Sequence, residues 1–159
     1  MIRLRKLCES DAASICRAWT GAQPLPGYLI PEDEARTAEL IAEWNRGEAR
    51  ETRFEMLLIE RNGQPAGLLS LLERGRDASL GISVHPTMQR QGIGAEAVRQ
   101  AAEFAQSVGW DSLVSECRAD NAASIALHEK CGFEQTGSRV NRKGNRVIVW
   151  RLTLKKENA

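Results

Sequence analysis

The sequence predicts an α/β fold with a mixed sheet, because apolar strand patterns and helical patterns alternate along its 159 residues. A strand that ends at Val84 is followed by a long helical segment and then by a strand from Asp111 to Cys117. Such a crossover implies that the two strands pair in parallel. Asn62-Gly63 lies between two apolar runs and is typical of a tight hairpin turn, which requires antiparallel pairing.

The first third of the chain predicts one strand and two helices. Ile2 to Leu7 alternates like a strand, and Glu9 to Trp19 has helical periodicity with an N-cap near Ser10. The proline- and glycine-rich stretch from Gly21 to Pro31 predicts an irregular loop. A second helix is expected from about Glu32 to Asn45.

The middle of the chain predicts three strands and a long helix. Phe54 to Glu60 and Pro65 to Leu72 are the two strands of the hairpin, and Ala78 to Val84 is the next strand. The helix is expected from Gly94 to Ser107, with one apolar side.

The last part predicts a short helix and a closing pair of strands. The helix begins after Asn121, and the strands are expected over Phe133 to Val140 and Asn145 to Leu154. The sequence has no repeat and no linker, so we expect one domain over residues 1–159.

A polar loop after Val84 has the features of a phosphate site. Gly92 and Gly94 open a long helix, so backbone N–H groups point to one place with the positive end of the helix dipole behind them. Glycine removes the side chains that would keep a phosphate from the backbone, and Arg90 adds a positive charge. These features predict a nucleotide-like cofactor that carries a pyrophosphate.

Two cofactor patterns compete for this loop. Gly92 to Ala97 fits the dinucleotide pattern G-x-G-x-x-A, with Glu116 at a suitable distance for a ribose contact. In that fold, however, the first glycine follows the strand almost directly, whereas residues 85–91 intervene here. The other pattern, Q/R-x-x-G-x-G/A, is met by Gln89 and the two glycines.

The short helix after Asn121 carries a second set of polar residues. Asn121 is a good N-cap, and Gly132 is a good residue just beyond the C-terminus. Asn121, Ser124 and His128 lie at i, i+3 and i+7 and therefore share one helical face. This face either offers hydrogen bonds to a ligand or is a solvated face with a capping asparagine.

Taken together, the two segments resemble the GNAT superfamily of acetyl-CoA-dependent N-acetyltransferases. The loop pattern is that of the family's pyrophosphate loop. The family's later motif, N-x-x-A/S-i-x-l-Y-e-k-x-G-F, is matched at Asn121, Ser124, Ile125, Leu127, Glu129, Lys130, Gly132 and Phe133. His128 departs from the usual tyrosine, and the resulting Leu-His-Glu is similar to the phosphinothricin-type acetyltransferases. The matching segments cover roughly residues 77–134.

The resemblance implies a mixed central sheet of about seven strands flanked by about four helices, with the parallel fourth and fifth strands splayed around acetyl-CoA. It implies that the backbone of Ile82, Ser83 and Val84 holds the thioester and the pantetheine arm, with the Val84 N–H as oxyanion donor. The other cofactor contacts that it implies are Gln89, Arg90, Gln91, Gly92, Ile93, Gly94, Ala95, Asn121 and Ser124.

The resemblance also suggests catalytic residues. His128 would protonate the departing thiolate, although a surface helical histidine is the alternative. Glu116 lies five residues before Asn121, where ribosomal-protein alanine acetyltransferases, similar in this segment, carry a catalytic glutamate. Glu73, at the end of the third strand, is the other candidate base. Either carboxylate could instead be a solvated group at a strand end.

The acceptor is expected between the early helices and the last hairpin. Candidate contacts to the acceptor are Trp19, Tyr28, Glu73 and Arg139. The hairpin lacks the tyrosine pair of ribosomal-protein N-terminal acetyltransferases, which favours a small amine such as an amino acid or its analogue, acetylated by direct transfer in a ternary complex. Protein N-terminal acetylation is one alternative, and a non-catalytic acetyl-CoA-binding regulatory domain is another.

Composition indicates a cytoplasmic enzyme domain. A net charge of +1 argues against nucleic acid or a membrane as an obligatory partner. No apolar run approaches the roughly 20 residues that span a bilayer, and the N-terminus has no signal-peptide core. The four cysteines show no metal-ligand spacing with the two histidines, so no metal is expected. A homodimer is left open.

Overall fold

A computed structural model describes residues 1–21, 30–47 and 52–155. It contains a seven-stranded sheet in the order β1-β2-β3-β4-β5-β7-β6. The strands are β1 (Ile2–Lys6), β2 (Phe54–Arg61), β3 (Gln64–Arg74), β4 (Asp77–Val84), β5 (Ser112–Arg118), β6 (Glu134–Val140) and β7 (Arg146–Thr153). β4 and β5 pair in parallel, whereas the other neighbouring strands pair antiparallel. The predicted mixed sheet is confirmed.

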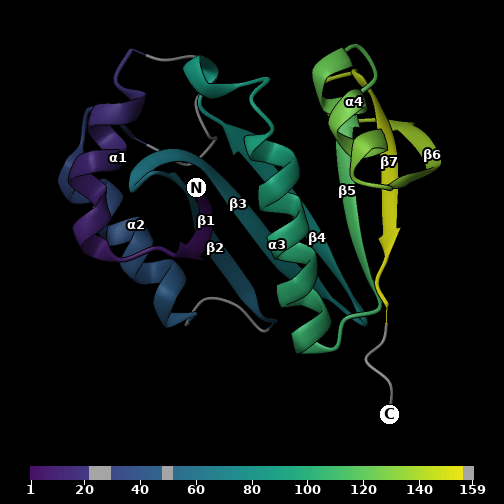
Figure 1. The fold of residues 1–159 in the computed structure, drawn as a ribbon, viewed down its shortest axis with the longest axis horizontal. Helices are drawn as coiled ribbons and strands as arrows, with labels where there is room; N and C mark the ends of the chain where they lie inside the picture. The colour runs from purple at the N-terminus through teal and green to yellow at the C-terminus, as the bar shows by residue number, and fades with distance from the viewer. Residues whose placement is uncertain (22–29, 48–51, 156–159) are drawn as a thin grey trace.

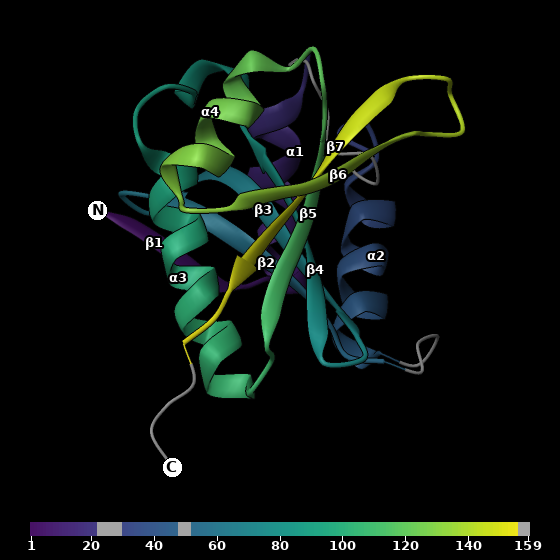
Figure 2. The same ribbon diagram turned by 90° about the vertical axis from the view of Figure 1, so that its right-hand side faces the viewer.

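Helices cover both faces of this sheet (Figures 1 and 2). The α-helices are α1 (Ala12–Trp19), α2 (Glu34–Arg46), α3 (Ile93–Val108) and α4 (Ala122–Lys130), and the short 3₁₀ segments are η1 (Glu9–Asp11) and η2 (Pro86–Met88). α3 and α4 lie on one face, and α1 and α2 lie on the other. None of the helices in the described ranges is long and apolar enough to cross a membrane.

The two layers have separate cores because side chains alternate along each central strand. In β3, Leu69 and Leu71 belong to the core under α3, which also contains Trp110 and Trp150. Leu68 belongs to the core under α1 and α2. A residue's position along a strand therefore decides which of the two layers its side chain meets.

Local signals account for most element boundaries. Asn62 and Gly63 both have positive φ, 51° and 80°, which is the conformation of the predicted tight turn between β2 and β3. α2 begins at Glu34, two residues after the expected start, because the Asp33 carboxylate accepts a hydrogen bond from the Arg36 N–H.

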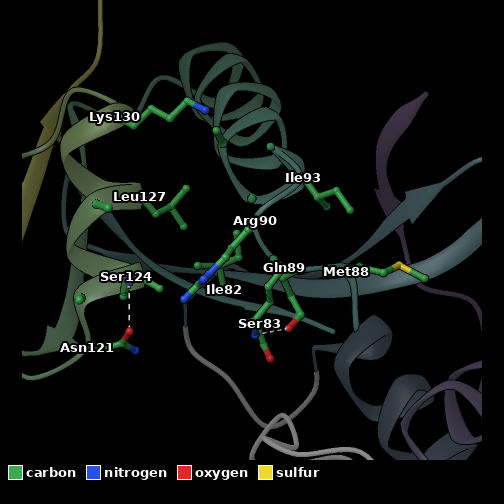
Figure 3. A pocket seen from close by; sticks show the side chains of 17 residues that line it. Ile82, Ser83, Met88, Gln89, Arg90, Ile93, Asn121, Ser124, Leu127 and Lys130 are labelled. Carbon is green, nitrogen blue, oxygen red and sulfur yellow. Dashed lines mark hydrogen bonds between the residues drawn. The ribbon is translucent and has the colours of Figure 1, made fainter. Parts of the chain in front are cut away.

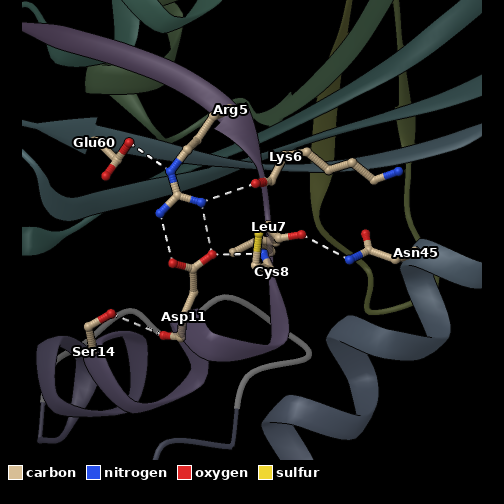
Figure 4. A network of polar contacts seen from close by, with 8 residues as sticks. All are labelled: Arg5, Lys6, Leu7, Cys8, Asp11, Ser14, Asn45 and Glu60. Atoms are coloured by element: carbon tan, nitrogen blue, oxygen red, sulfur yellow. Dashed lines mark hydrogen bonds and ion pairs between the residues drawn. The ribbon is translucent and has the colours of Figure 1, made fainter.

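A polar network joins the helical layer of α1 and α2 to the edge of the sheet (Figure 4). Arg5 of β1 donates to both carboxylate oxygens of Asp11, at 2.9 and 2.7 Å, and to Glu60 of β2 at 2.8 Å. Asp11 also accepts from the Cys8 N–H at 2.7 Å, and the Arg5 contact lowers the pKa of the Asp11 carboxyl. α1 therefore begins at Ala12, after η1, and the single helix expected from Glu9 is wrong.

β4 and β5 separate part-way along their length. Their ladder comprises four residue pairs, from Asp77–Ser112 to Leu80–Ser115. Beyond Leu80, β4 pairs only with β3, and beyond Ser115, β5 pairs only with β7. Figure 1 shows the two ribbons diverging toward α4. The predicted splay is confirmed, and the antiparallel β7 beside β5 overturns the dinucleotide-binding alternative.

Candidate functional site

A cavity of about 750 Å³ opens where β4 and β5 diverge. Its walls are the end of β4, the loop before α3, and α4 (Figure 3). The lining residues are Ile82, Ser83, Val84, Met88, Gln89, Arg90, Gly92, Ile93, Gly94, Ala95, Asn121, Ala122, Ala123, Ser124, Ala126, Leu127 and Lys130. These include two cations and no acidic residue, so the cavity suits an anion.

The loop before α3 forms an anion cradle. Arg90 and Gly92 both have left-handed backbone conformations, with φ of 65° and 77°. Gly92 caps α3 without a side chain, so the N–H groups of its first turn have neither an intrahelical acceptor nor a side-chain cap. Successive N–H groups in such turns point to a common centre. The loop therefore has a backbone geometry that suits an anion, and phosphate binding there stays a prediction.

The open edge of β4 offers backbone hydrogen bonds. The His85 N–H donates to Ala66 of β3 at 2.7 Å. Because N–H groups alternate in direction along a strand, those of Val84 and Ile82 turn the other way, toward the region that β5 has left. The Gln89 side-chain amide donates a hydrogen bond to the Val84 carbonyl oxygen at 3.1 Å. The Val84 N–H therefore lies on the unpaired edge of β4, and its role as oxyanion donor stays a prediction.

The close approach of α3 and α4 depends on a glycine. A Cβ at Gly94 would lie 3.3 Å from a methyl group of Leu127 and 3.6 Å from Val84. α3 and α4 therefore approach each other closely at Gly94 and Leu127, which both line the cavity. Gly92, in contrast, has open space at its Cβ position, where only the positive φ disfavours a side chain.

α4 presents a mainly apolar side to the cavity. Asn121 and Ser124 line it as predicted, and Asn121 caps the helix by accepting from the Ser124 N–H at 3.1 Å. The remaining lining residues of α4 are Ala122, Ala123, Ala126, Leu127 and Lys130. The predicted polar face is therefore wrong beyond its first turn. The sequence of α4 carries no clear signal for this face, because small and apolar residues lie on several sides of the helix.

His128 is buried on the sheet side of α4 and does not line the cavity. Its Nδ1 lies 2.7 Å from the Ser124 carbonyl, which can only accept, so Nδ1 carries the proton. Nε2 then accepts from the Ser115 hydroxyl at 2.9 Å. The ring stacks on Trp150 and meets Phe133 edge-on. The expectation that His128 faces the cavity with Asn121 is wrong, because this aromatic pocket holds the imidazole beneath the helix.

Glu116 points to the opposite face of the sheet from the α4 side. Its neighbours Ser115 and Cys117 turn toward His128 and Trp150, so alternation directs Glu116 toward the face of α1 and α2. Arg139 of β6 binds both carboxylate oxygens, at 3.0 and 2.6 Å. The two side chains are 40% and 52% exposed, so the pair is accessible to an incoming molecule.

Glu73, the other candidate base, lies far from the cavity. It pairs with Ala78 at the start of β4, whereas Val84 ends that strand six residues later, roughly 20 Å away. Its carboxylate accepts a hydrogen bond from the Trp110 indole at 2.8 Å. The hairpin register therefore excludes Glu73 from the reaction centre.

The other residues that the sequence analysis assigned to the site do not line the cavity or lie outside the described residues. Trp19 is fully buried and packs edge-on against His85, so its expected contact with an acceptor is wrong. Tyr28 lies outside the described residues. Gln91 does not line the cavity, because its side-chain oxygen accepts from Arg61. Met88 and Lys130 line the cavity without having been predicted to bind a cofactor.

Comparison with known families matches residues 2–134 to the acetyltransferase (GNAT) domain. This span covers most of the chain, including the loop at Gln89 and the helix at Asn121. The chain belongs to the GNAT acetyltransferase family.

The proteins that this chain resembles differ in the acceptors that their names give. The [ribosomal protein bS18]-alanine N-acetyltransferase of Escherichia coli K12 is 34% identical over 98 residues, which are 61% of this chain and 64% of that protein. A RimL ribosomal L7/L12 α-N-protein acetyltransferase in complex with coenzyme A has a TM-score of 0.81 at 20% identity, over 96% of this chain and 94% of that one. Spermidine N-acetyltransferase from Vibrio cholerae has a TM-score of 0.74 at 20% identity, over 96% and 93%. The two structural likenesses concern the fold alone.

The burial of His128 predicts a pH dependence of stability. Burial lowers the pKa of the folded imidazole below its ordinary value of 6.5, so the unfolded chain takes up a proton that the folded chain excludes. Lowering the pH below about 6.5 should therefore reduce the free energy of unfolding. The His128→Phe variant keeps an aromatic ring but cannot titrate, so its stability should fall less between pH 7 and pH 5.

Urea unfolding at a series of pH values measures both slopes. A variant with the same pH dependence as the wild-type protein would show that His128 is not the group responsible.

Proposed function

We propose that this chain transfers the acetyl group of acetyl-CoA to the α-amino group at the N-terminus of a protein. The observation that carries the proposal is the combination of an anion cradle and an unpaired strand edge in a single cavity. A long cofactor with a pyrophosphate at one end and an amide-bearing arm at the other requires both features.

The pyrophosphate would bind at the start of α3. Arg90 and Lys130 supply positive charge from opposite walls of the cavity, and the first turn of the helix supplies free N–H groups. Gly94 and Leu127, at which α3 and α4 approach each other closely, also line the cavity. Lys130 joins the cofactor-binding set on this basis.

The pantetheine arm would extend along β4 in the place that β5 leaves. Its amide groups can pair with the exposed backbone of Ile82 as an added strand would. The thioester oxygen would then accept from the Val84 N–H as negative charge develops on it. Removing one such donor typically costs about 3–4 kcal/mol of transition-state stabilisation.

The acceptor amine would approach from the face of Glu116. Its nitrogen attacks the thioester carbon, the new C–N bond forms, and the C–S bond breaks as coenzyme A departs as a thiolate. Glu116 takes the proton that the amine loses, and water protonates the thiolate. Arg139 orients the Glu116 carboxylate through its two hydrogen bonds. His128 has no direct part in this scheme, because both of its ring nitrogens bind protein groups.

The comparisons support a protein α-amine more than the small amine that the sequence favoured. The relative of 34% identity acts on an alanine of ribosomal protein bS18, and the structural relative with a TM-score of 0.81 acts on an α-amine of a ribosomal protein. A free amino acid is the second candidate. The adjacent Glu116 and Arg139 charges favour it, because they would complement its ammonium and carboxylate groups.

An acceptor panel tests the proposal. Coenzyme A release should be rapid with peptides that have a free N-terminal amine, and it should be lost when that amine is blocked by a formyl group. Free amino acids and spermidine serve as the competing acceptors. Preference for a free amino acid over every peptide would replace the main proposal with the second candidate. Acetyl-CoA binding with no release for any amine would support a regulatory domain.

Gly92 tests the pyrophosphate cradle. A valine there should weaken acetyl-CoA binding roughly 100-fold, since two lost hydrogen bonds to a charged group cost about 3 kcal/mol. Calorimetry measures the affinity. The matched control is Gly75→Val, which places the same side chain at a positive φ with open space, in the distant turn between β3 and β4. Equal affinities in the two variants would remove the cradle from the site.

Glu116 tests the assignment of the base. Glu116→Gln keeps the shape of the side chain and one oxygen for Arg139, but it cannot take a proton. We expect kcat to fall about 100-fold or more, with little change in acetyl-CoA affinity. Glu73→Gln is the matched control and should leave kcat unchanged, because Glu73 lies at the other end of β4. A normal rate for Glu116→Gln would leave deprotonation to water.

A further inference from the structure

The β6–β7 hairpin extends beyond the body of the molecule on the side of α2 (Figure 2). All residues of β6 are exposed, and Val140 at its end is 61% exposed. The turn that follows is well organised: the Asn141 side-chain oxygen accepts from the N–H groups of Lys143 and Asn145, both at 3.0 Å. The hairpin is therefore an ordered projection, and hydrogen bonds hold the backbone of its turn.

The hairpin is also the most one-sided charged segment of the chain. From residue 135 to residue 154 the sequence contains five basic residues and no acidic one. Arg139 pairs with Glu116, and Arg151 pairs with Asp77. Arg142, Lys143 and Arg146 are exposed and have no acidic partner among the described residues. We call these three residues the basic tip.

We propose that the basic tip binds acidic residues that follow the N-terminal amine of the acceptor polypeptide. This inference rests on the proposed function, because it places the amine at Glu116. Arg139 lies on β6, the strand that leads into the turn with Arg142 and Lys143, and it contacts Glu116 at 2.6 Å. A chain with its amine at Glu116 can thus run along β6 toward the tip.

The geometry gives the position of these acidic residues. Arg142 and Lys143 lie three and four residues beyond Arg139, in the turn after β6, so the chain between them spans at most about 10–13 Å. An extended acceptor covers that distance in about three to four residues. Positions three to five of the acceptor should therefore carry Asp or Glu. A nucleic acid is a poorer fit, because the chain as a whole carries a formal charge of only +1.

The experiment uses three peptides that begin with the same two residues and carry Glu, Gln or Lys at positions three to five. KM and kcat are measured for the wild-type protein, the variant Arg142→Glu/Lys143→Glu, and the control Arg3→Glu/Lys155→Glu. The control makes the same change in net charge on exposed residues outside the hairpin. Binding of fluorescently labelled peptides, measured by anisotropy, gives a readout that does not need turnover.

For the wild-type protein and the control, we expect the Glu peptide to have a KM about tenfold lower than the Gln peptide, with equal kcat, and an advantage that shrinks as salt is added. The hairpin variant should lose this advantage and should favour the Lys peptide. Equal KM and equal binding for the three peptides would overturn the proposal. So would equal losses in both variants, or RNA binding through the tip without peptide discrimination. If no peptide is acetylated but the wild-type protein still binds the Glu peptide tightly, the surface stands and the proposed function fails.

Discussion

Backbone hydrogen bonds between β4 and β5 stop after Leu80 and Ser115, and the arrangement of the site follows from that point. Parallel strands that stayed paired would use up the N–H groups of Ile82 and Val84 and would leave no room for a ligand between them. Beyond this point β4 stays hydrogen-bonded to β3, and β5 stays hydrogen-bonded to β7. Both strands therefore remain extended and ordered after they separate. A chain with amide groups of its own can satisfy the exposed edge, and the cradle before α3 lies where such a chain would end.

Features determined by neighbouring residues could be predicted from the sequence. The turn at Asn62-Gly63 requires positive φ at two successive residues, and Asn-Gly is one of the few residue pairs that adopt this conformation readily. Gly92 and the uncapped start of α3 are equally local, so the glycine turn and the start of the helix were predicted close to their observed positions, and phosphate binding there stays a prediction. The parallel pairing of β4 and β5 was also predicted correctly. The segment that connects them is long and helical, so it cannot be a hairpin loop.

The errors concern contacts between distant parts of the chain. α4 has small or apolar residues on several sides, so its own pattern does not determine which side faces the sheet. Trp150 and Phe133 decide it by enclosing His128. In the same way, the register of β3 with β4 places Glu73 away from the cavity. The burial of Trp19 depends on packing against residues more than thirty positions away, such as Met56 and Leu68.

The cavity and the proposed acceptor site lie on opposite faces of the sheet. Residues that line the cavity come from the segment between Ile82 and Lys130, whereas the Glu116–Arg139 pair and the hairpin lie on or beyond the opposite face. Substitutions on α1, α2 or the exposed tip of the β6–β7 hairpin can therefore accumulate without disturbing the cavity wall. A descendant of this chain could acquire a different acceptor by altering one side alone, while inheriting its cofactor chemistry unchanged.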